Sequence, residues 1–99
     1  MSIVYTPKRP RARRLDMNTA GALALAVIHE HAGLPFAPSS THRVPYIATK
    51  HETRRWGDKL AAYLRDNRIP EQPDLANDIN ALARLWSRFL ILCEGYNAG

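Results

Sequence analysis

The stretch LANDINALARLWSRFLILCE, residues 75–94, decides the fold class. Its apolar residues recur at the three- and four-residue spacing of an amphipathic helix, with polar residues between them. Asp74 follows a proline and is a suitable N-cap, and Gly95 is a suitable end. The sequence therefore predicts a helix over 75–94. Its core stripe consists of Leu75, Ile79, Leu82, Trp86, Phe89, Leu90 and Cys93.

A second helix is predicted over 50–67. Thr49 and Glu52 have the spacing of a capping box, in which each side chain satisfies a free backbone N–H group near the other residue. The apolar periodicity that follows is again helical. The expected core face consists of Thr53, Trp56, Leu60, Tyr63 and Leu64.

A third helix, the first in chain order, is predicted over 17–32. Asp16 or Asn18 can cap it, and Gly33 ends it. One face is expected to be buried, and it contains Ala20, Leu23, Ala24, Val27 and His31.

The three segments predict an all-α fold. In it, helices 50–67 and 75–94 form an antiparallel hairpin, and helix 17–32 packs across that hairpin. The connection 33–48 is long and rich in proline, and a short strand at 44–47 is an alternative within it. The expected aromatic core consists of Trp56, Tyr63, Trp86 and Phe89.

Residues 1–15 carry the charge that sets this chain apart. They hold five bases and no acid, which equals the net charge of +5 of the whole chain. Prolines and mutual repulsion disfavour a helix there. We therefore expect a flexible basic N-terminal arm over 1–15 and a single helical domain over 16–99. The apolar, β-prone run from Ile3 to Tyr5 leaves two alternatives, docking on the domain or on a second copy.

Motifs for chemistry are weak throughout. His29, His31 and Ser39 resemble the zinc motif of the JAMM-type isopeptidases, but His42 stands where that motif needs aspartate. Cys93 lies on the apolar stripe, where an inert buried thiol is expected. The scattered glycines build no phosphate-binding loop. We expect no enzymatic activity, no cofactor and no metal, although a structural metal site using His42 or His51 stays an alternative.

Basic residues form the first candidate binding set. They would contact the phosphates of a nucleic acid or an acidic protein, and the alternative for each is ordinary solvated charge. The set comprises Lys8, Arg9, Arg11, Arg13 and Arg14 of the arm and Arg54, Arg55 and Arg65 of the second helix.

The end of the third helix forms the second candidate set. Residues 89–93 are apolar on every side of a helix, whereas a monomer core buries one stripe. Ile91 projects on the side of Arg84 and Arg88, and Leu92 projects sideways. A protein interface, either a homodimer or a different partner, is one prediction for these four residues. Burial under the N-terminal run or the first helix is the alternative.

We expect a small non-enzymatic regulator or inhibitor that binds a larger protein or nucleoprotein machine. In size and character the chain is similar to the small proteins that phages and mobile elements use against host systems, including anti-CRISPR proteins. The alternative is a nucleic-acid-binding accessory protein that uses the arm and the second helix. The single cysteine favours the cytoplasm, and the longest apolar run is too short to span a membrane.

Overall fold

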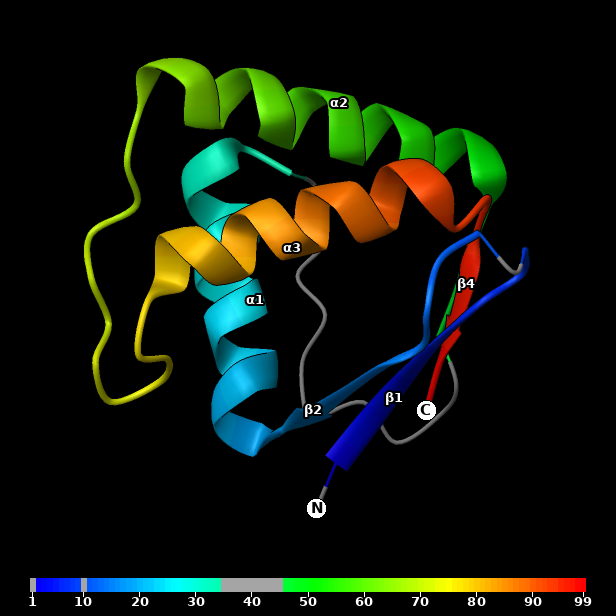
Figure 1. Ribbon diagram of the computed structural model, residues 1–99, viewed down its shortest axis with the longest axis horizontal. Coiled ribbons are helices and arrows are strands. Elements are labelled where there is room, and N and C mark those ends of the chain that lie inside the picture. The colour runs from blue at the N-terminus through cyan, green and yellow to red at the C-terminus, as the bar shows by residue number, and fades with distance from the viewer. Residues whose placement is uncertain (1, 10, 35–45) are drawn as a thin grey trace.

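The protein has an α+β fold, seen in a computed structural model that describes residues 2–9, 11–34 and 46–99 (Figure 1). The expected all-α fold is wrong, because a four-stranded antiparallel sheet accompanies the helices. In chain order the elements are β1 (Ser2–Pro7), β2 (Leu15–Asn18), α1 (Thr19–Ala32), β3 (Tyr46–Ala48), α2 (Lys50–Asp66), α3 (Ile79–Leu92) and β4 (Tyr96–Ala98).

The sheet joins the two ends of the chain. Its strand order is β2-β1-β4-β3, so the N-terminal strand is an inner strand between β2 and the C-terminal β4. Tyr5 pairs with Leu15 on one side and with Ala98 on the other. Its side chain is fully buried. The flexible arm expected over 1–15 is therefore wrong for residues 2–7, and the apolar run from Ile3 to Tyr5 packs within the sheet and the core.

The basic residues of the N-terminal region lie in the connection of a β-hairpin. β1 and β2 pair antiparallel, and the exposed side chains between them include Lys8, Arg9, Arg11 and Arg13. The backbone N–H of Lys8 donates to the carbonyl of Gly95 at 3.0 Å, and that of Arg9 donates to the carbonyl of Cys93 at 3.3 Å. These bonds attach the connection between β1 and β2 to the end of α3. We call this connection, with described residues 8–9 and 11–14, the basic hairpin turn.

The helices resemble the predicted ones in position more than in their buried faces. The capping box of α2 is confirmed, because the backbone N–H of Glu52 donates to the hydroxyl of Thr49 and the backbone N–H of Thr49 donates to the carboxylate of Glu52. Helix α3 begins at Ile79 and not at residue 75, because Asp78 is the N-cap and accepts from the N–H of Ala81 at 3.0 Å. Asn18 caps α1, and Gly33 ends it with a left-handed φ of 69°.

Helix α1 buries a different face from the expected one. His31 was expected on the buried face but is exposed, and the fully buried histidine is His29. Leu23 is 39% exposed although it was expected in the core. The run Ala20–Ile28 is apolar on nearly every side, so its periodicity could not indicate which face packs inward.

Helices α2 and α3 run side by side in opposite directions, and α1 crosses them (Figure 1). In this view α1 and the sheet lie next to each other below the hairpin formed by α2 and α3, and the core lies between α1, the sheet and these two helices. Trp86 is at its centre, with ring centroids 5.1 Å from Tyr5, 5.4 Å from Phe89 and 5.7 Å from Tyr96. Of the four aromatics expected in the core, Tyr63 is only half-buried.

Candidate interaction surface

A groove of about 530 Å³ runs between α2 and α3. It brings together all four residues of the predicted interface, Arg84, Arg88, Ile91 and Leu92, and adds Arg65 from the predicted basic set. The remaining lining residues are Ala61, Leu64 and Ser87. The volume is in the range of pockets that hold small ligands or peptide side chains.

Small residues set the depth of this groove. Ser87 donates its hydroxyl to the carbonyl oxygen of Gly57 at 3.1 Å, which ties the two helices together at a point without a Cβ on α2. Ala61 and Ser87 add little volume at the contact, whereas Leu64, Arg65 and Arg88 extend beyond it. Two closely packed helices with longer side chains on either side therefore leave a depression between them.

Two further hollows continue from the groove. One, of about 270 Å³, is lined by Arg11, Lys50, Arg54, Ile91, Leu92 and Glu94. The other, of about 420 Å³, is lined by Arg11, Ala12, Arg13, Leu15, Leu85, Arg88, Phe89 and Leu92. Leu92 lines all three, so they form one continuous surface around the end of α3. We call the residues that line them the Leu92 surface.

The Leu92 surface is apolar in the middle and positive around it. Each of five arginines, Arg11, Arg13, Arg65, Arg84 and Arg88, lines a hollow, and none of them has a carboxylate within 4.0 Å in the described part of the chain. Arg11 is nevertheless near enough to Glu94 to contribute to the lowering of its pKa. An exposed arginine without an intramolecular partner keeps its hydrogen-bond donors available for a carboxylate or phosphate. The surface is therefore suited to an anionic ligand that also carries apolar groups.

Glu94 is the one acidic residue that lines the described hollows. Its carboxylate contacts the ammonium of Lys50 at 3.0 Å and the guanidinium of Arg9 at 3.4 Å. The hydrogen bond from Lys50 is the main cause that lowers the pKa of Glu94. Glu94 thus stays ionised and neutralises part of the charge where α3 meets the hairpin turn.

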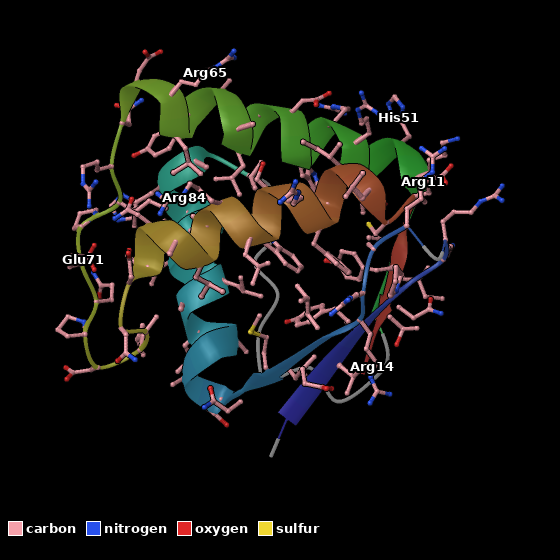
Figure 2. All side chains as sticks on the ribbon, in the orientation of Figure 1. Arg11, Arg14, His51, Arg65, Glu71 and Arg84 are labelled. Atoms are coloured by element: carbon pink, nitrogen blue, oxygen red, sulfur yellow. The ribbon has the colours of Figure 1, made fainter. Side chains whose placement is uncertain are left out.

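The predicted basic set is divided by the fold. Arg11, Arg13, Arg54 and Arg65 line the hollows, whereas Lys8, Arg9, Arg14 and Arg55 line none of them. Figure 2 shows Arg65 and Arg11 at opposite ends of the helical hairpin, and Arg14 near the sheet. Some members are also paired, since Arg14 lies 3.9 Å from Asp16 and Arg54 lies 3.3 Å from Asp58. Binding of nucleic acid by this set stays a prediction.

Sequence reasoning missed several residues of the surface. Leu85 is 48% exposed and lines the hollow beside the hairpin turn. It adjoins Trp86 but falls off the buried stripe of α3, which is the signal that could have identified it. Leu64 was assigned to the core, and it packs against the core but is partly exposed in the groove. Leu15 and Ala12 were placed in the arm, where no packing was expected.

Of the residues considered for chemistry, two are buried, two are exposed (His31 and His51), and two lie outside the described residues. Cys93 is fully buried, as expected, and burial raises the pKa of its thiol. His29 accepts the indole N–H of Trp86 at 3.0 Å, and burial lowers its pKa to about 3. Ser39 and His42 are outside the described residues. Within residues 2–9, 11–34 and 46–99, no three His, Cys, Asp or Glu side chains gather to hold a metal ion.

No helix of the described chain has both the length and the apolar character needed to cross a membrane. Comparisons with protein families, with curated proteins and with solved structures give no match.

Proposed function

We propose that this protein is a small non-enzymatic regulator or inhibitor that acts by binding a surface of a larger protein or nucleoprotein assembly. One observation carries the proposal: the Leu92 surface combines partly exposed apolar side chains with arginines that have no carboxylate within 4.0 Å among the described residues. Protein interfaces are enriched in arginine and have an apolar centre inside a polar rim. When a partner supplies carboxylates, the new hydrogen bonds to the arginines offset the free-energy cost of removing these side chains from water.

The resemblance to the small proteins of phages and mobile elements, including anti-CRISPR proteins, concerns size and character alone. It favours an inhibitor of a host assembly as the role of the interface. A cytoplasmic setting fits this proposal, because the single cysteine is buried as a free thiol and forms no disulfide within the chain.

A nucleic-acid-binding accessory protein is the second candidate. The exposed arginines of the hairpin turn, Arg11 and Arg13, favour it because they project from one short segment. Two observations make it second. Its eight predicted residues do not form one face, and only one aromatic side chain, Phe89, lines the described hollows, where single-stranded nucleic acid would need stacking platforms.

Affinity capture from the source cell tests the proposal with the full chain. Wild type, Arg88→Glu and Arg55→Glu would be tagged alike, because both substitutions change the charge equally and only Arg88 lines the hollows. The proposal expects a stoichiometric protein that survives nuclease treatment, is retained by Arg55→Glu and is lost with Arg88→Glu.

Recovery of nucleic acid without a stoichiometric protein would contradict the proposal and favour the second candidate. In that case binding should weaken steeply with added salt, by a slope of about 0.9 per phosphate contact on duplex DNA. Sedimentation of the purified chain distinguishes a homodimer from a complex with a different partner.

A further inference from the structure

The arginines of the Leu92 surface follow an order along the helical hairpin. Arg65 and Arg84 lie together at one end, and Arg11 lies at the other (Figure 2). Arg11 shares its hollow with Lys50 and Arg54 of α2 and with Glu94, and Arg54 also lies 3.3 Å from Asp58. This end therefore keeps a smaller excess of positive charge than the end with Arg65 and Arg84. Between the two ends the lining is mainly apolar, with Leu64 and Ala61 on α2 and Ile91 and Leu92 on α3, and it also includes Ser87 and Arg88 of α3.

The dimensions of this arrangement follow from helix geometry. Arg54 and Arg65 are eleven residues apart on α2, which corresponds to about 16 Å along the axis. Arg84 and Arg88 are one turn apart on α3, about 6 Å. A complementary ligand therefore needs negative charge near both ends of a length of about 16 Å and apolar groups between them.

We propose that the α2–α3 groove binds an amphipathic helix of about three turns on the partner protein, with acidic residues in its first and last turns. This inference rests on the proposed function and specifies the partner's chemistry. Three helical turns match the distance of about 16 Å along α2 between Arg54 and Arg65. Leucine-like side chains at i, i+3, i+4 and i+7 of the partner helix form one stripe, which would pack against the apolar residues of the groove. Charge complementarity selects the acidic partner, because the groove itself is lined by Arg65, Arg84 and Arg88 and by no carboxylate.

Other occupants fit the same residues less well. A second copy of this chain would bring the same arginines against each other on a protein of net charge +5. A nucleic acid would satisfy the guanidinium groups but would leave the floor formed by Leu64, Ile91 and Leu92 without apolar contacts.

The test uses the full chain and a synthetic helical peptide of about 12 residues, with leucines at i, i+3, i+4 and i+7 and glutamates in both end turns. Binding is measured by fluorescence anisotropy at physiological salt. The double variant Arg65→Glu/Arg84→Glu should lose at least about tenfold in affinity, as expected for central arginine contacts. The matched double variant Arg14→Glu/Arg55→Glu changes net charge equally at positions outside the hollows and should lose less than about threefold, since only screened long-range attraction is affected.

Two further measurements separate the groove from general charge attraction. A peptide with lysines in place of the glutamates should have a higher affinity for the Arg65→Glu/Arg84→Glu variant than for the wild-type protein. In the wild-type protein, the amide NMR signals of Leu64, Ile91 and Leu92 should shift on addition of the acidic peptide.

Each of several results would overturn the inference. The first is absence of peptide binding, and the second is an equal loss of affinity for the peptide in the two double variants. The third is undiminished binding of a peptide whose leucines are replaced by serines. The fourth is displacement of the peptide by duplex DNA or phosphatidylserine vesicles at a concentration lower than that of the peptide. If Arg65→Glu/Arg84→Glu still captures the cellular partner, this inference fails while the proposed function stands. If no protein partner is captured at all, the proposed function fails.

Discussion

The α-carbon of Gly57 faces the side chain of Ile91 across the helical hairpin. A Cβ at residue 57 would lie 2.6 Å from Cγ1 of Ile91 and 3.0 Å from its backbone nitrogen. The first contact is closer than real Cβ atoms come, and the second involves backbone that cannot rotate away. The absence of a side chain at this position thus sets the separation of α2 and α3, and with it the shape of the groove.

Gly57→Ala should therefore destabilise the protein although alanine is the better helix former. We expect a net loss of about 1–2 kcal/mol, because overpacking outweighs the gain of about 1 kcal/mol in helix propensity. Urea denaturation of the two proteins measures it.

Gly21→Ala is the matched control for that experiment. There a Cβ would meet the flexible Sδ of Met17 at 3.1 Å, which can move aside, so the change should be smaller. If Gly57→Ala is as stable as wild type or more so, the close contact of the helices does not limit the fold.

The buried His29 should make the protein sensitive to acid. Its pKa is 6.5 when exposed and about 3 in the fold, because burial disfavours the charged ring. Below pH 6.5 the unfolded chain binds a proton that the folded chain does not, so the free energy of unfolding falls as the pH falls toward 3. Between pH 8 and pH 5 this loss should be about 2 kcal/mol, from about 1.4 kcal/mol per pH unit.

His29→Gln is the control for this pH dependence. Glutamine can still accept the indole N–H of Trp86 but does not titrate. The variant should be less stable at pH 8 and should lose less stability than wild type between pH 8 and pH 5. Equal pH profiles in urea titrations would show that another group causes the acid sensitivity.

Tyr5 allows the ring and the hydroxyl of one core residue to be tested separately. Its ring is fully buried beside Trp86, whereas its hydroxyl has no hydrogen-bond partner in the described structure. Tyr5→Ala should cost about 3–5 kcal/mol, as expected for emptying an aromatic core site. Tyr5→Phe should leave the stability unchanged or raise it, because it removes a buried polar atom without a partner.

Thermal unfolding followed by circular dichroism measures both variants. A small loss in Tyr5→Ala would mean that the N-terminal strand is detached in solution, as the basic arm predicted from the sequence would be. In the structure described here, deletion of residues 1–14 removes an inner strand, and the truncated chain should fail to fold.

The helical hairpin could be predicted from the sequence, whereas of the sheet only a short strand at 44–47 was considered, which overlaps β3. The capping box at Thr49 and the stripe around Trp86 are local signals, and a strong local signal survives into the fold. β1 and β4 contain six and three residues and come from opposite ends of the chain. Their pairing is non-local, and prolines and arginines around a short apolar run concealed it.

The candidate surface shows the same division. Helical spacing alone predicts that Arg84, Arg88 and Ile91 lie on one side of α3. The addition of Arg65 and Arg11 depended on the packing of α2 and on the hairpin turn, which no periodicity in the sequence indicates. His29 is buried in place of His31, which was expected on the buried face, because α1 is apolar on almost every side and its periodicity does not identify that face.

The most direct test of the account is photocrosslinking in the source cell, with a photoreactive amino acid in place of Leu85 or, in a matched protein, in place of Asn97. Leu85 is exposed and lines a hollow of the Leu92 surface, and its replacement leaves every arginine of that surface in place, whereas Asn97 is exposed on the sheet. The account predicts that the probe at residue 85 forms one discrete crosslinked product with a protein, and that the probe at residue 97 does not. A product from residue 97 alone, or a product at residue 85 that consists of nucleic acid, would contradict it.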